Sequence, residues 1–234
     1  MTRHELKEQL QHDHFTDAVS EVVSYAFSNP KRLIRWIVLL VLVLILAGGA
    51  LWFAAYQKSI RQEALAAALH VIETPVATSS SHLPNSYPTQ EAKQQAEIKI
   101  LSNMITKYSG SREGLITQYY LGTVKAERKD PRGAESDLRR VADSKSDFAP
   151  LAKIALAQLY AGENRMQEAK GLLQSIANKP SDLVSKAQAD ILLAQLNLTT
   201  NPQEAKKILQ SLRGPNQPPS VSRAVDQLSG ELMR

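Results

Sequence analysis

The chain has 234 residues, a formal net charge of +5 and no cysteine. The absence of cysteine excludes disulfides, thiolate metal sites and a cysteine nucleophile. The excess positive charge lies after residue 35 and is scattered in runs of at most two, which favours a solvated surface over a nucleic-acid footprint, with attraction to an anionic membrane as the weaker alternative.

Residues 1–30 are predicted to form a cytoplasmic amphipathic helix. Apolar side chains from Phe15 to Phe27 recur at helical spacing on one face. The helix either lies on the inner membrane surface or binds a partner helix, and its polar face is poor in Lys and Arg, which weakens the first alternative. His12 and His14 lack an evident third ligand, so no metal site is predicted and both are interpreted as solvent-exposed.

A transmembrane helix is predicted over residues 31–57. Trp36 to Tyr56 run for 21 positions without a charge, and a helix of that length spans roughly 31 Å, close to the bilayer core of about 30 Å. An apolar core this long, starting after residue 35, favours a retained anchor over a cleaved signal. Basic residues are denser before the span (Lys31, Arg32, Arg35) than after it (Lys58, Arg61), which favours a cytoplasmic N-terminus.

Residues 58–110 are predicted to form an incomplete first helical hairpin. Arg61 to Ile72 continues the anchor as a helix, and Thr89 caps a second helix that ends near Gly110. Residues 74–88, between the two helices, contain several prolines and a serine run, so they are predicted to be a flexible loop.

Residues 111–214 contain three repeats. The segments beginning at Ile154 and Ile191, Ile-Ala-Leu-Ala-Gln-Leu-Tyr and Ile-Leu-Leu-Ala-Gln-Leu-Asn, are offset by 37 residues. A second pair, starting at Gln167 and Gln203, is offset by 36, and a third copy starts near Tyr119. A period of 34–37 residues built from two helices is typical of tetratricopeptide repeats. The region therefore resembles a degenerate tetratricopeptide array, and the predicted fold class is all-α: one N-terminal transmembrane helix followed by a helical-hairpin solenoid.

Turn residues mark the boundaries of the repeat helices. Asp130-Pro131 and Asn201-Pro202 are expected to start second helices, with the acidic or amide side chain as the cap. Gly162-Glu163-Asn164 is expected to end one helix and cap the next. Residues 215–234 follow a proline-rich break and are predicted to form a C-terminal capping helix, with Ser220 as its cap, because a solenoid needs its open end covered.

The order of these elements resembles the bacterial family of the ancillary SecYEG translocon subunit, single-span inner-membrane proteins with tetratricopeptide-like repeats. The specific similarity lies in the run from Ala96 to Ser111, in Tyr119-Tyr-Leu-Gly and in the helix containing Ala134. The resemblance implies an inner-membrane protein with a periplasmic repeat domain. Its implied partners are translocon subunits, periplasmic chaperones or emerging chains.

No phosphate loop, zinc-protease helix or serine-nucleophile motif is present in the sequence. Acidic pairs such as Glu135 and Asp137 are interpreted as solvent-exposed, so no catalytic residues and no cofactor are predicted. The leading hypothesis is a non-enzymatic scaffold that binds proteins. The alternatives are a scaffold for a cell-division or outer-membrane assembly complex, a eukaryotic import receptor with cytosolic repeats, and a single-span enzyme.

The first helices of the repeats are expected to line a concave face. Their mixed apolar and neutral polar side chains favour a groove for an apolar or extended segment, and the alternative is that neighbouring repeats cover them. A carboxylate clamp made of Lys and Asn is not predicted, because Tyr and Thr stand at those positions in the first repeat. The candidate groove residues are Tyr119, Thr123, Ile154, Gln158, Ile191 and Gln195.

Overall fold

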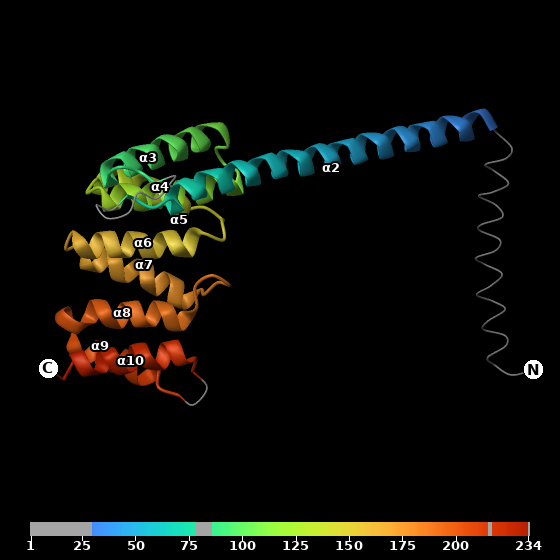
Figure 1. Ribbon diagram of the computed structural model, residues 1–234. Helices are drawn as coiled ribbons and strands as arrows, with labels where there is room; N and C mark the ends of the chain where they lie inside the picture. Colours follow the sequence, from blue (N-terminus) through green and yellow to red (C-terminus); the bar gives the residue numbers. More distant parts are fainter. Residues whose placement is uncertain (1–29, 78–85, 215–216, 234) are drawn as a thin grey trace, which may run out of the picture. The chain divides into compact units, whose positions relative to one another are not determined.

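The computed structural model describes residues 30–77, 86–214 and 217–233 (Figure 1). Every helix or strand named within those ranges is an α-helix, so the predicted all-α class is confirmed. The chain divides into two compact units, Met1–Ile60 and Arg61–Arg234. The amphipathic helix expected before residue 30 lies outside the described residues.

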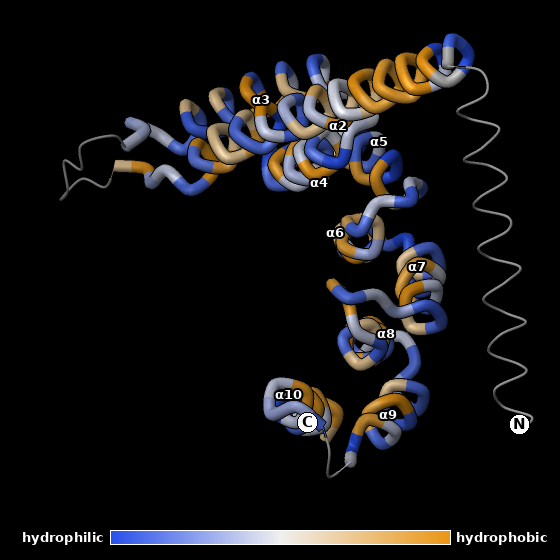
Figure 2. The backbone as a smooth tube through the Cα atoms, turned by 90° about the vertical axis from the view of Figure 1, so that its right-hand side faces the viewer, coloured by the Kyte–Doolittle hydropathy of each residue, from blue (hydrophilic) through white to orange (hydrophobic). Residues whose placement is uncertain are grey.

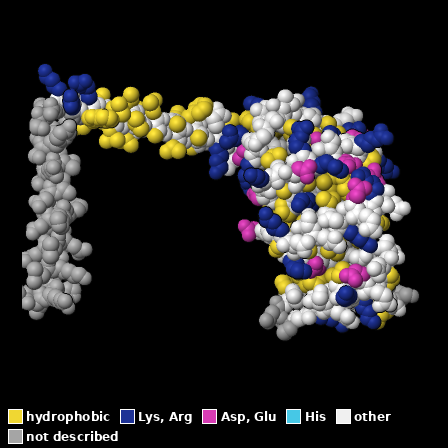
Figure 3. Space-filling view, turned by 180° about the vertical axis from the view of Figure 1, so that it is seen from behind, with side chains coloured by type: hydrophobic (Ala, Val, Ile, Leu, Met, Phe, Trp, Pro, Cys, Tyr) yellow, Lys and Arg dark blue, Asp and Glu magenta, His cyan; other side chains and the backbone are white. Residues whose placement is uncertain are grey.

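Helix α2 (Pro30–Glu73) contains the predicted membrane span. Its large apolar side chains from Ile34 to Tyr56 are between 47% and 73% exposed. Figure 3 shows hydrophobic side chains covering this stretch, with Lys and Arg side chains at its start. A continuous apolar surface of this size is unusual on a protein surrounded by water. By length and composition α2 is the one helix in the described ranges that could cross a membrane, which is compatible with a single-pass anchor.

The second unit is a succession of helical hairpins. The end of α2 packs with α3 (Gln90–Lys107) and α4 (Arg112–Glu127) in one core cluster that includes Ala68 and Leu101. The helix predicted over Arg61 to Ile72 is present as this last part of α2. The remaining helices are α5 (Pro131–Ala142), α6 (Ala149–Gly162), α7 (Met166–Asn178), α8 (Lys186–Thr200), α9 (Pro202–Ser211) and α10 (Pro219–Glu231).

Three of the five predicted helix caps are present in the structure. The Thr89 hydroxyl accepts a hydrogen bond from the Ala92 amide at 3.1 Å, and the Asn201 side chain accepts one from the Glu204 amide at 3.3 Å. Asp130 caps α5 in the same way, through the Gly133 amide at 3.0 Å. These side chains satisfy backbone donors that a helix start leaves unpaired.

Two predicted caps are wrong. Asn164 does not cap α7, which begins at Met166 without a side-chain cap. Its φ of 63° places it in the left-handed region, as does the φ of 60° at Lys129 in the equivalent turn of the preceding hairpin. Asn164 therefore shapes the turn between two helices. Ser220 lies inside α10, because the helix already starts at Pro219, where a proline is favoured in the first turn.

The hairpins stack so that their helices form two layers. Figure 2 shows α6 and α8 in one layer and α7 and α9 in the other. A core cluster runs through the stack and includes Leu138, Leu156 and Leu173, and a second cluster around Leu209 and Val225 joins α10 to the last hairpin. Within this arrangement a cavity lies between α6 and α8.

Candidate functional site

A cavity of about 200 Å³ lies between α6 and α8, the first helices of two successive hairpins. We call it the α6–α8 groove. Its base includes Leu173 of α7, which is fully buried. The other lining residues are Ile154, Ala157, Gln158 and Ala161 of α6 and Leu192, Gln195 and Leu196 of α8.

The chemistry of the groove is an apolar floor flanked by two carboxamides. Gln158 and Gln195 are exposed, whereas the aliphatic lining is half-buried or buried. A carboxamide both donates and accepts hydrogen bonds, as a peptide group does. The groove can therefore take an apolar side chain of a bound segment while the two glutamines pair with its backbone.

Three of the six predicted groove residues, Ile154, Gln158 and Gln195, meet in this cavity. The other three lie elsewhere in the repeat unit. Ile191 packs against the C-terminal core cluster. The Tyr119 ring is half-buried and makes an edge contact with Phe148 at 5.8 Å between ring centres, and its burial raises the pKa of its phenol.

Thr123 is also outside the groove. Its hydroxyl donates to the carbonyl of Tyr120 at 2.8 Å, a local bond within α4. The structure therefore confines the candidate surface to the second and third repeats, with no contribution from the first. The binding role of all six residues remains a prediction.

Leu192 and Leu196 line the groove but were not predicted. In the repeat alignment Ile191 is equivalent to Ile154, so the same face was expected on both helices. Two neighbouring helices face a shared groove with opposite sides. On α8 the lining residues therefore lie one position later in the sequence than the equivalents of the α6 residues. The i, i+4 pair of leucines on an otherwise polar flank is the sequence signal that could have identified them.

A charged network joins the first repeat to the second. Glu135 of α5 accepts hydrogen bonds from Arg165 at 2.8 Å, Arg139 at 2.6 Å and the Tyr160 hydroxyl at 2.9 Å. The Arg165 guanidinium also lies 3.8 Å from the centre of the Tyr160 ring. These donors, Arg165 first, lower the pKa of Glu135 to about 2. The network therefore helps to fix α6, one wall of the groove, against the preceding hairpin.

The interpretation of Glu135 and Asp137 as solvent-exposed is wrong. Glu135 is in the network above, and Asp137 is 9% exposed. Asp137 accepts hydrogen bonds from the Gln118 amide at 3.1 Å and the Lys125 ammonium at 2.6 Å, both from α4. Periodicity assigned it to the outer face, but the closeness of α4 to α5 brings this flank of the helix into the hairpin contact.

No three His, Asp or Glu side chains within the described ranges form a group that could hold a metal ion. What the described residues do build is a stack of helical hairpins with a groove between first helices. A structure of this kind, preceded by one long apolar helix, defines a tetratricopeptide-type scaffold, a class that acts by binding other proteins.

Comparison with known proteins agrees with this class. The family model described as a tetratricopeptide repeat-like domain matches residues 31–211, and the chain belongs to that family. The matched range includes the apolar stretch of α2 as well as the hairpins through α9. Among curated proteins and among solved structures, the chain has no match.

Proposed function

We propose that the protein is a scaffold of the bacterial inner membrane that holds partner proteins against its repeat domain, next to the Sec translocon and periplasmic chaperones. The α6–α8 groove is the observation that carries the proposal, because it combines an apolar floor with two exposed carboxamides. Segments that emerge from a translocon are extended and in part apolar, which matches that lining.

The proposed topology is a single pass with the N-terminus in the cytoplasm and the repeats in the periplasm. The greater density of basic residues before the span supports this orientation. In this arrangement residues 111–214 are the binding array, residues 215–234 cover its end, and residues 1–30 provide a second, cytoplasmic contact. External protease added to spheroplasts should digest the repeats, and their survival would contradict the orientation.

The order of the elements supports the Sec assignment over another envelope complex. Co-purification from membranes in mild detergent discriminates between the two. Enrichment of translocon subunits with the wild-type chain supports the proposal. Their absence, together with enrichment of a cell-division or outer-membrane assembly complex, would replace it with the alternative.

The groove itself is tested by the double change Gln158→Ala and Gln195→Ala. Both side chains are exposed, so the fold should be unaffected, while two hydrogen bonds to a bound segment are removed. Losses of about 1 kcal/mol each predict a reduction in partner capture of roughly tenfold or more. Gln167→Ala with Gln174→Ala is the matched control, because these glutamines are equally exposed but lie on α7, away from the groove. Equal capture by both double variants would remove the groove from the proposal.

A further inference from the structure

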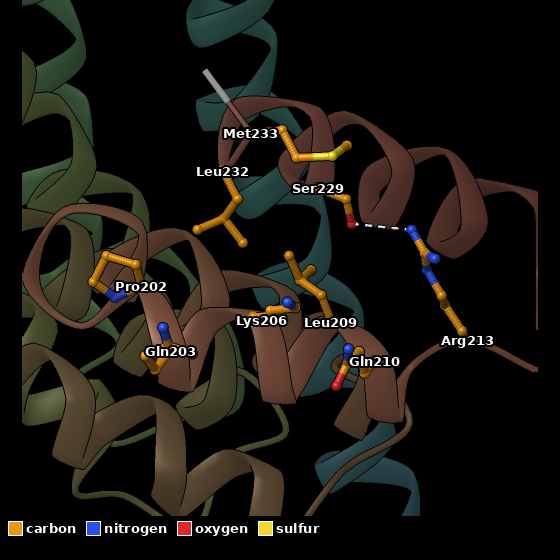
Figure 4. A pocket seen from close by; sticks show the side chains of 9 residues that line it. All are labelled: Pro202, Gln203, Lys206, Leu209, Gln210, Arg213, Ser229, Leu232 and Met233. Carbon is orange, nitrogen blue, oxygen red and sulfur yellow. Dashed lines mark hydrogen bonds between the residues drawn. The ribbon is translucent and has the colours of Figure 1, made fainter.

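A second cleft, of about 400 Å³, lies between α9 and α10 (Figure 4). We call it the C-terminal cleft. Figure 4 shows Lys206 and Gln210 of α9 on one side of it, and Ser229 of α10 and Leu232, which follows α10, on the other. Its lining contains two cations, Lys206 and Arg213, and no carboxylate.

Residues at equivalent positions of the preceding hairpins make contacts that the residues of the cleft do not make. Lys206 is equivalent to Glu135 of α5 and to Lys170 of α7. Each of those side chains binds the hairpin that follows: Glu135 through Tyr160 and Arg165, and Lys170 through the Thr200 hydroxyl at 2.9 Å. Among the described residues Lys206 has no equivalent partner on α10. The side chain at this repeat position binds the following hairpin in the first two repeats, whereas in the third, Lys206 lines the cleft.

A second repeat position is also buried in the preceding hairpins and exposed in the last one. Ala142 and Ala177 are buried where the next hairpin packs on the second helix. The equivalent residue after α9 is Arg213, which is exposed. Arg213 donates to the Ser229 hydroxyl at 3.3 Å and lies 3.9 Å from the Asp226 carboxylate, a long and exposed pair. The last hairpin therefore presents a large cation where the others present a small apolar contact.

The position of α10 explains why the cleft is open. α6 and α8 each pack extensively against the second helix that precedes them, α5 and α7 respectively, whereas α10 packs less on α9 than on α8. The seam that a first helix normally fills is thus only partly filled at the end of the array. Within it, Gln203, Lys206, Gln210 and Arg213 are spaced by three, four and three residues, which places them along one side of α9.

The apolar side of the cleft is available to a ligand. Leu232 is half-buried, and Met233 is 82% exposed. An exposed methionine beside a cationic stripe is a lining that adapts to the apolar side chains of a bound helix. A helix normally fills this seam, and here the lining is apolar on one side and cationic on the other. The ligand that fits such a lining is a helix with one apolar face and acidic side chains beside it.

We propose that the C-terminal cleft binds an acidic amphipathic helix of a partner protein. The apolar face of that helix packs on Leu232 and Met233, above the buried Leu209, and its carboxylates pair with Lys206 and Arg213. The bound helix completes the seam that α10 leaves open. The site shares no lining residue with the α6–α8 groove, so it does not depend on the function proposed for that groove.

The proposal is tested with a random display library of peptides of about 15 residues, which is long enough to form a helix. Peptides that bind the full-length chain in detergent are selected. The counter-selection uses Lys206→Glu with Arg213→Glu. Enriched peptides are then synthesised and their Kd values measured. The matched control is Lys99→Glu with Arg140→Glu, which makes the same charge change at exposed positions of α3 and α5.

We expect enriched peptides with an apolar stripe and an excess of Asp and Glu. Their binding should weaken at least about tenfold on the cleft double variant, because like charges then face each other, and should be unchanged on the control variant. Met233→Ser, at an exposed side chain, should weaken it severalfold.

Three outcomes would overturn the proposal. The first is no enrichment over an unrelated membrane protein, or enrichment of peptides without acidic residues. The second is concentration-dependent self-association that the cleft variant abolishes, which would assign the surface to a second copy. The third is that flotation with anionic-lipid vesicles depends on Lys206 and Arg213 while binding of the peptides does not. That result would assign the surface to a membrane.

Discussion

Gly122→Ala is expected to destabilise the repeat unit, although alanine is the better helix former. Gly122 lies inside α4, where an added Cβ would be 2.6 Å from Leu138 Cγ and 3.3 Å from the Leu138 backbone nitrogen. Carbon atoms in ordinary contact are about 3.5–4.0 Å apart, so α4 and α5 would have to move apart by up to about 1 Å. Overpacking costs about 1–3 kcal/mol, against a gain of about 1 kcal/mol in helix propensity.

Gly171→Ala is the matched control, because Gly171 lies in the middle of α7 with nothing within 4 Å of an added Cβ. Thermal unfolding of the full chain in detergent, followed by circular dichroism, measures both variants. Each kcal/mol shifts the Tm of a unit this size by about 2–4 °C. Gly171→Ala should raise the Tm by about that amount, and Gly122→Ala should melt about 2–12 °C below it. Equal increases would refute the close approach of α4 and α5.

Three further changes test individual contacts of the repeat unit. Arg61→Ala should lower the free energy of unfolding by about 2–3 kcal/mol, because Glu113 is 3% exposed and would lose its cation; adding Glu113→Gln should restore part of the Tm, and no recovery would contradict this. The pKa of Glu135 is lowered to about 2 in the folded chain, so its contribution is fully present above about pH 4.5 and is lost as the pH falls toward about 2. Denaturation midpoints measured across that range should fall less steeply for Glu135→Gln, and parallel curves would exclude the network. Lys129→Gly should raise stability by about 1 kcal/mol, because Lys129 has a φ of 60°, and a lower Tm would show that another conformation is adopted.

Features determined by nearby residues could be predicted from the sequence. The caps at Thr89 and Asn201 join side chain and backbone three residues apart, and the helix starts they mark were placed correctly. The apolar part of α2 follows from its uninterrupted uncharged run, and its extension to Glu73 agrees with the helix predicted from Arg61 to Ile72. The repeat fold follows from three copies of one pattern, because agreement among copies reinforces a weak signal in any one of them.

Features determined by the rotation of one helix against another could not be predicted. Ile191 and Leu192 are adjacent in α8, yet one packs in the terminal core and the other lines the groove. Helical periodicity cannot separate such neighbours, because they differ by less than a third of a turn. Asp137 shows the same limit, since its burial depends on how closely α4 approaches α5. Of the two wrong caps, Asn164 falls in a turn, where backbone conformation depends on both flanking helices, and Ser220 falls inside α10, which starts one residue earlier at Pro219.

The repetition of the array also explains why two different surfaces arise from one motif. Inside the stack, each second helix is covered by the following hairpin, while the seam between the first helices α6 and α8 stays open and gives the neutral α6–α8 groove. At the last hairpin the following cover is incomplete, and positions that were buried or paired, such as those of Lys206 and Arg213, become a cationic surface. The two sites have no lining residue in common, so the effects of variants at each should add unless one partner spans both. A membrane anchor would hold both sites near partners in the same membrane and raise their effective concentration.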